Sequence, residues 1–152
     1  MKPILFFVSL LVSSLSFSAF AQKSSIEETP AKVIQFKEVF TMVSVDDNLE
    51  VVLTNGSSDN ILVDDNVKAT LSEGHLYVSA KNPQLAAGNK VLIPANFLSR
   101  VYMNNNGSLR SETVLSNQKV KIYLASEAKI NVRSLGNVSV ETVGDILFVK
   151  GR

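Results

Sequence analysis

Three stretches in the second half of the chain decide its fold: RVYMNNNGSLRSE at residues 100–112, VKIYLASEAKINVR at 120–133 and VSVETVGDILFVKG at 138–151. Each begins with alternating apolar residues, turns at a polar corner and continues with a second apolar step at Leu109, Ile130 or Ile146. Successive stretches are offset by about 20 and then about 17 residues, and imperfect repeats near this length are typical of β-solenoid coils. A barrel or sandwich built of hairpins is the alternative.

The same alternation extends back to residue 39, where Val39, Thr41, Val43 and Val45 are expected to share one buried face. Side chains alternate across a strand, and β-branched residues, which favour strands, dominate these sets. Clusters of Gly, Asn and Asp separate the sets and end strands by bonding local backbone. No window of a dozen residues carries a helical apolar stripe. The sequence therefore predicts an all-β protein, with antiparallel hairpins over residues 39–80 and a β-solenoid after residue 98.

Composition excludes several classes of protein. The 152 residues include no Cys and one His, which excludes a disulfide scaffold, a Cys-ligated metal site, a thiol nucleophile and a lipid anchor on Cys. Lys and Arg number 15 against 14 acids. Duplex binding depends mainly on neutralising phosphates, so this charge balance argues against nucleic acid as a partner.

The N-terminus predicts export. Residues 1–21, MKPILFFVSLLVSSLSFSAFA, combine a basic Lys2, an apolar run and a small-x-small cleavage site that ends at Ala21. This three-part pattern is typical of a secretory signal peptide, and the apolar run is shorter than the ~20 residues that a membrane span needs. We expect a polar segment at residues 22–35 and a single domain at 36–152. The mature protein would be periplasmic, cell-surface or secreted, with no transmembrane segment.

Much of the mature chain resembles a known family. The quoted runs are FTMVSVDDNLEVVLTNG (40–56), ILVDDNVKATLSEGHLYVSAKN (61–82) and KVLIPANFLSRVYMNNNG (90–107). They are similar to the auto-transporter adhesin head (GIN-type) domain, a bacterial family of unknown function that is frequent in Bacteroidetes. The resemblance covers about residues 36–150. It implies a right-handed β-solenoid, no known enzymatic activity and an envelope or surface location.

Two related acidic segments are candidates for a metal site. VDDNL at 45–49 and VDDNV at 63–67 lie 18 residues apart and offer the hard oxygen ligands that Ca²⁺ prefers. A calcium cage needs six or more converging oxygens, and neither an EF-hand loop nor the RTX nonapeptide is present. Both segments lie where strands must end, so we interpret them as turns in which Asp and Asn bond the local backbone. No metal or cofactor is predicted.

Two other polar features invite a functional interpretation. His75 shares a strand face with Tyr77, but it has no predicted carboxylate or nucleophile partner, so we interpret it as a solvated surface residue. Asn104, Asn105 and Asn106 form the most unusual tripeptide. We expect an internal corner whose amides stack on neighbouring coils, and a polar glycan-binding surface is the alternative.

Three tyrosines fall on outward positions of their strands, and Tyr102 and Tyr123 are 21 residues apart, near one coil spacing. This spacing predicts an exposed aromatic column, and tyrosine is favoured at recognition surfaces for carbohydrate and protein. Ordinary cross-strand packing is an equally weighted alternative. The candidate surface-recognition residues are Tyr77, Tyr102, Tyr123, Arg100, Arg110 and Asn104.

The function predicted from these features is that of an exported, non-catalytic binding or scaffolding module, adhesin-like, with an unidentified protein or glycan partner. The alternative is a polysaccharide-acting β-helix enzyme, which needs clustered acids. A lipid carrier would need an open apolar cavity, which coils filled by Val, Ile and Leu do not leave. The acids of residues 98–150 fall in separate turns or strands, namely Glu112, Glu127, Glu141 and Asp145.

The last apolar run, Ile146 to Val149, is apolar on both of its faces. An uncovered solenoid end exposes apolar side chains and unpaired backbone groups. We therefore expect residues 146–150 to pair with another copy, with a partner protein, or with the N-terminal segment 31–40, in which residues 33–36 are the intramolecular candidate. Pairing with another copy would give self-association through this strand.

Overall fold

The computed structural model describes residues 32–56, 59–116 and 119–144. These residues form twelve β-strands and one short 3₁₀ turn, η1 (Pro83–Leu85), so the all-β prediction is confirmed. No helix in this part of the chain has the length and hydropathy to cross a membrane. The signal peptide and the last apolar run, predicted at residues 1–21 and 146–149, lie outside the described residues.

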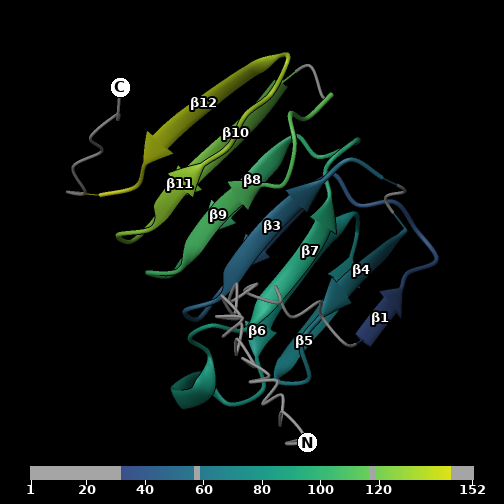
Figure 1. Ribbon diagram of the computed structural model, residues 1–152, viewed down its shortest axis with the longest axis vertical. Coiled ribbons are helices and arrows are strands. Elements are labelled where there is room, and N and C mark those ends of the chain that lie inside the picture. Colours follow the sequence, from purple (N-terminus) through teal and green to yellow (C-terminus); the bar gives the residue numbers. More distant parts are fainter. Residues whose placement is uncertain (1–31, 57–58, 117–118, 145–152) are drawn as a thin grey trace, which may run out of the picture.

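The strands form two six-stranded sheets that face one another (Figure 1). In spatial order, the first sheet contains β1 (Lys32–Gln35), β4 (Asn60–Val63), β7 (Lys90–Pro94), β3 (Glu50–Thr54), β9 (Ser108–Ser111) and β11 (Lys129–Asn131). The second contains β12 (Asn137–Thr142), β10 (Lys119–Leu124), β8 (Arg100–Met103), β2 (Met42–Val45), β6 (His75–Ala80) and β5 (Val67–Ser72).

The three repeats identified in the sequence lie side by side. Arg100 of β8 pairs in parallel with Lys121 of β10, and Lys119 of β10 pairs in parallel with Asn137 of β12. In the first sheet, β9 and β11 also pair in parallel, with Leu109 opposite Ile130. The strands that open the three repeats therefore pair in parallel. The first two repeats cross from the second sheet to the first at their polar corners, between β8 and β9 and between β10 and β11, which keeps matching positions on matching faces.

The first half of the chain differs from the predicted series of hairpins. Only β5 and β6 form one, through the turn at Glu73-Gly74. Strands β2 and β3 belong to different sheets and are joined by the corner at residues 46–49, and β4 and β5 are joined in the same way at residues 64–66. The hairpin prediction is wrong for these pairs because a turn sequence ends a strand without specifying where the next strand pairs.

The chain order also departs from the spatial order. Strands β2 and β3 pair in parallel with β6 and β7 on one side and with β8 and β9 on the other. Figure 1 shows this arrangement in the first sheet, where β3, in blue, lies between the teal β7 and the green β9. The partners of β8 and β9 thus lie 58 residues earlier in the sequence, as in the pair Met42 and Arg100.

The core lies between the sheets and consists mainly of Val, Ile and Leu side chains from the inner faces of the strands, together with Met103, Phe40 and several alanines. The predicted inward set at residues 39–45 is correct for Val43 and Val45, but Val39 is 49% exposed and Phe40 is fully buried. The alternation shifts because the amides of Thr41 and Met42 both donate to the carbonyl oxygen of Gly74, which places two residues opposite one, as in a β-bulge.

The first strand lies at one edge of the first sheet. Residues 32–35 form β1, which pairs antiparallel with β4 from Lys32 opposite Val63 to Gln35 opposite Asn60. This pairing places β1 at the opposite end of the first sheet from β11. Residues 146–150 lie outside the described residues, so their pairing with residues 33–36 stays a prediction.

Candidate functional site

Four aromatic rings form one stack on the outward face of the second sheet. Tyr102 on β8 and Tyr123 on β10 are register partners, and their ring centroids lie 4.8 Å apart with an interplanar angle of 10°. The imidazole of His75 lies 5.8 Å from the ring of Tyr102 and 4.2 Å from that of Tyr77, with angles of 29° and 17°. The stack crosses strands β6, β2, β8 and β10.

The small side chain of Ser44 makes room for the imidazole. Ser44 on β2 is the register partner of both Tyr77 and Tyr102, so two ring-bearing strands flank it. Strands lie about 4.8 Å apart, which leaves roughly two spacings between these tyrosines. His75 fills this gap from β6, and its Nε2 lies 2.7 Å from the Ser44 hydroxyl. His75 is thus half-buried in the stack, which corrects the interpretation of it as a solvated surface residue.

The rings present their edges and hydroxyl groups to solvent, because neighbouring faces cover one another. Tyr77 is 46% exposed, and Tyr102 and Tyr123 are half-buried. None of the three phenol hydroxyls hydrogen-bonds to another residue of the described part of the chain. The stack therefore offers a row of polar donors and acceptors on a rigid aromatic base.

Two cations lie beside the stack. Arg100 and Lys121 each precede a stacked tyrosine by two residues and are register partners on β8 and β10. The Lys121 Nζ donates to the Glu141 carboxylate at 3.2 Å. This hydrogen bond and the negative charge of Glu141 raise the pKa of Lys121 above its usual value, and the nearby Arg100 opposes the rise. Arg100 itself lies against the Met42 sulfur, and within the described residues no carboxylate pairs with it.

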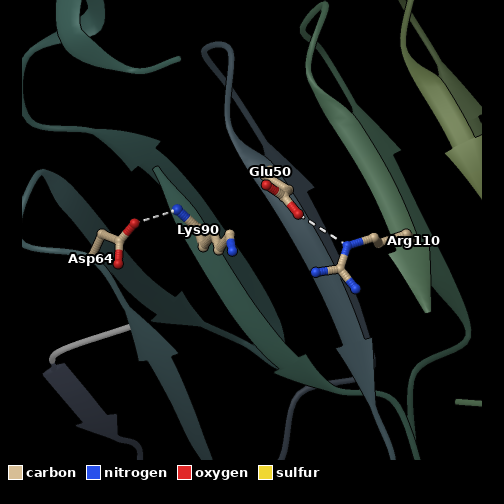
Figure 2. A network of polar contacts seen from close by, with 4 residues as sticks. All are labelled: Glu50, Asp64, Lys90 and Arg110. Carbon is tan, nitrogen blue, oxygen red and sulfur yellow. Dashed lines mark hydrogen bonds and ion pairs between the residues drawn. The ribbon is translucent and has the colours of Figure 1, made fainter. Parts of the chain in front are cut away.

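Arg110 does not belong to this surface. It lies on the first sheet, in β9, where its Nε donates to the Glu50 carboxylate at 3.0 Å (Figure 2). Glu50 is also the register partner of Lys90, so this carboxylate lies between two cationic strands. Sequence spacing could not separate Arg100 from Arg110, because the corner at residues 104–107 moves the chain from one sheet to the other.

Asn104 lies at that corner, two residues beyond Tyr102, and its amide donates to the Asp46 carboxylate at 3.0 Å. The next residue, Asn105, is 6% exposed; its Nδ2 donates to the Val45 carbonyl oxygen and its Oδ1 accepts from the Gly107 amide. The tripeptide thus forms a corner braced against the preceding β2–β3 corner, in which Asn105 is internal and Asn104 and Asn106 are exposed. The expected stacking of the amides is replaced by hydrogen bonds to Asp46 and to the backbone of Val45 and Gly107. Asn104 is thus a structural neighbour of the aromatic stack, and its side-chain amide already donates a hydrogen bond to Asp46.

The carboxylates of the VDDN segments are engaged by backbone of the adjacent strand. Asp47 accepts from the Ala80 amide at 2.8 Å, and Asp64 accepts from the Lys90 amide at 2.6 Å (Figure 2). These are turns, as interpreted from the sequence, but the bonds reach residues 33 and 26 positions away rather than the local backbone. No group of three or more metal-ligating acids, His or Cys occurs among the described residues.

The acids considered for the enzyme alternative lie apart. Glu112 follows β9 at the end of the first sheet, Glu127 lies in the corner between β10 and β11, and Glu141 lies on β12 paired with Lys121. Asp145 falls outside the described residues. General acid and base catalysis needs two groups that face one substrate, and these three acids belong to a turn, a corner and a strand face.

Comparison with known proteins shows similarity at the level of the fold. No family model matches the chain, and neither does any curated protein. Solved structures of candidate adhesins from Bacteroides fragilis, Parabacteroides merdae and Parabacteroides distasonis are similar to it, with TM-scores of 0.52, 0.50 and 0.50. Their sequence identities are 15%, 17% and 12%, and the alignments cover 75%, 76% and 76% of this chain.

The chain spans only part of these structures, since the alignments cover 62%, 57% and 56% of them. At such identities the likeness shows a shared all-β fold. The function of the present chain must therefore be argued from its own surface.

Proposed function

We propose that the protein is an exported, non-catalytic binding module of the cell envelope or cell surface, adhesin-like in its role. The contact surface is the outward face of the second sheet, centred on the four-ring stack of His75, Tyr77, Tyr102 and Tyr123. The stack carries this proposal, because four aligned rings on a solvent-facing sheet present hydroxyl groups without a protein partner among the described residues. Rigid amphipathic aromatic side chains bind at a low cost in conformational entropy.

The finer fold proposal is a right-handed β-solenoid of the GIN-type adhesin head family, covering residues 36–152. The in-register parallel pairing of β8, β10 and β12 supports it, as do the corners by which the chain passes from β8 to β9 and from β10 to β11 in the first sheet. The fold likeness to candidate adhesins agrees with the proposed role. The separation of Glu112, Glu127 and Glu141 disfavours the enzyme alternative.

Binding to intact bacterial cells tests the proposal. Fluorescently labelled protein is compared with the double variant Tyr102→Ser/Tyr123→Ser by flow cytometry. We expect the variant to lose most of the bound signal while keeping its circular dichroism spectrum. The matched control is Lys129→Ser/Asn131→Ser, which changes two exposed residues on the first sheet. Equal binding by wild type and both variants would contradict the assignment of the surface.

Export is tested separately. The pattern that ends at Ala21 predicts that the mature protein begins at Gln22. Mass spectrometry of the protein from the envelope fraction should give the mass of residues 22–152. Recovery of chains that retain Met1 from that fraction would contradict cleavage at this site.

A further inference from the structure

Charge is distributed unevenly over the fold, although the whole sequence is nearly neutral. Among the described residues, Glu50 and Glu141 are the acids that lie within strands, and the others lie in corners, turns and loops. The cations show the opposite distribution. Those within strands are Lys32, Lys68, Lys90, Arg100, Arg110, Lys119, Lys121 and Lys129. The two sheet faces are therefore cationic surfaces on a chain without a large excess of positive charge.

The two faces balance their cations differently. On the first sheet, Glu50 lies between the strands that carry Lys90 and Arg110, and its carboxylate pairs with Arg110 (Figure 2). On the second sheet, Arg100 and Lys121 are direct register partners, and Glu141 pairs with Lys121 from the far side. Like charges directly opposite one another destabilise a sheet, so this pair has no evident structural benefit. An anionic group bound between Arg100 and Lys121 would remove the repulsion.

We infer that the stack and the Arg100–Lys121 pair form one binding site for an acidic polysaccharide. This inference rests on the proposed function and names the ligand class. A carboxylate or sulfate group of the polymer accepts charge-assisted hydrogen bonds from the guanidinium of Arg100, with Lys121 beside it. Sugar hydroxyls on either side of that group exchange hydrogen bonds with the hydroxyls of Tyr77, Tyr102 and Tyr123. An extended polymer that runs across strands β6, β2, β8 and β10 passes Tyr77, Tyr102 and Tyr123 in that order, with Arg100 and Lys121 beside the last two.

The charge balance favours such a polymer over other polyanions. Duplex nucleic acid and anionic membranes carry dense charge, and their binding needs many cations together. This site offers the Arg100–Lys121 pair, with Lys119 two residues before Lys121 on the same outward side of β10. Neutral hydroxyl groups flank the pair, which matches a ligand whose charges are spaced among many hydroxyls. Arg100 is exposed, and its planar guanidinium suits a carboxylate or sulfate.

Titration calorimetry measures the affinity of the purified protein for each of four polymers. The probes are polygalacturonate, its fully methyl-esterified form, dextran sulfate and unmodified dextran, so that each anionic polymer has a neutral counterpart. We expect at least one anionic polymer to bind and its neutral counterpart to bind about tenfold more weakly or not at all. Polygalacturonate and dextran sulfate distinguish a carboxylate from a sulfate as the recognised group.

The variant Arg100→Gln should weaken binding about tenfold, because it removes the charge-assisted hydrogen bonds. Arg110→Gln is the matched control, the same substitution on the opposite sheet, and should bind like wild type. Thermal melting of both variants verifies that they fold. Equal loss in the two variants would show diffuse charge attraction and overturn the assigned site.

Other outcomes separate this inference from the proposed function. Equal affinity for the charged and neutral polymers would overturn the selection of acidic polymers and leave a neutral glycan as the ligand of the proposed surface. If the protein binds none of the polymers but attaches to cells in a way that depends on Tyr102 and Tyr123, the inference of a polysaccharide ligand is wrong and the proposed binding function still holds. Binding only to vesicles of phosphatidylglycerol and phosphatidylcholine would assign the cations to a membrane.

Discussion

At the scale of single residues, side-chain size decides which groups meet on this protein. Ser44 is small enough to leave a gap between Tyr77 and Tyr102, and His75 fills it. Gly107 has the same kind of role inside the corner, where a Cβ atom would lie 2.1 Å from the Leu49 carbonyl oxygen and 2.7 Å from the Asn105 Oδ1. In both places a small side chain, or none, allows neighbouring strands or corners to come into contact.

Gly107→Ala is therefore expected to destabilise the protein by about 1–3 kcal/mol, because backbone at Leu49 must move to accept the methyl group. Chemical denaturation of the variant measures the change. Gly56→Ala is the matched control, since its Cβ would approach nothing closer than the Pro94 Cβ at 3.9 Å. A Gly107→Ala variant as stable as Gly56→Ala would contradict the packing of this corner.

Truncation of two neighbouring side chains on β10, Ile122 and Tyr123, should change the free energy of unfolding by different amounts. Ile122 is fully buried between the sheets, so Ile122→Ala should lower the free energy of unfolding by about 2–5 kcal/mol. Tyr123 points outward and stacks on Tyr102, so Tyr123→Ala should lower it by about 0.5–1.5 kcal/mol. Denaturant titrations of the two variants test the register of β10. The reverse order of effects would place β10 one residue out of register, since such a slip exchanges its faces.

At the scale of elements, the polar corners join the layers of the fold. Asp47 and Asp64 cap amides of neighbouring strands, and Asn105 ties its corner to Val45. Buried or strand-end amides need such partners, since an unpaired amide is costly. Asp47 also adopts a positive φ of 63°, a backbone region in which Asp and Asn are enriched. Asp and Asn are thus suited to these corners by hydrogen bonding and by backbone conformation.

Asp64→Ala removes the acceptor of the Lys90 amide and should lower the free energy of unfolding by about 1–3 kcal/mol. Asp65→Ala, in the same corner, is the control and should change it by less than about 0.5 kcal/mol. Thermal or denaturant unfolding of the pair makes the comparison. Equal stability of the two variants would show that the Asp64 bond contributes nothing.

The same corners make a prediction about metals. Oxygens of Asp46, Asp47 and Asp64 are directed at N–H groups of the protein, an arrangement that differs from a converging calcium cage. Addition of EDTA should therefore leave the melting temperature unchanged. A fall of several degrees would indicate a bound metal, because a ligand that binds only the native state stabilises it by mass action.

At the scale of the whole molecule, spatial order and chain order differ. Strands β2 and β3 occupy the middle of the parallel stack, and strands that come later in the sequence lie on both sides of them. The two ends of the stack also differ. At one end β4 pairs antiparallel with β7 and β5 pairs antiparallel with β6, and at the other end β12 extends the second sheet. Within the described residues, β12 has β10 as its single neighbour.

The apolar residues 146–149 follow this end, outside the described residues, and self-association through them stays a prediction. Light scattering should give a species larger than the monomer for wild type and a monomer for Leu147→Lys, because a charge on the apolar face disfavours its burial. A wild-type monomer that is unaffected by Leu147→Lys would exclude association through this strand.

Sequence alone determined the features that depend on local periodicity and turn chemistry. Period-2 alternation predicted the all-β class, and the spacing of Tyr102 and Tyr123 placed them side by side on β8 and β10. The turn chemistry of residues 104–106 also predicted a corner there, in which Asn105 is internal. These predictions succeeded because neighbouring repeats were separated by short stretches of chain, so that the local pattern and the spatial neighbour coincided.

Only the tertiary structure decided which distant strands pair. Backbone hydrogen bonds are alike along any strand edge, so the sequence does not mark Met42 as the partner of Arg100, 58 residues later. The gap over Ser44 that holds His75, and the assignment of Arg100 and Arg110 to opposite sheets, both follow from this pairing. The proposed binding surface is therefore assembled across strands from side chains whose proximity no local pattern encodes.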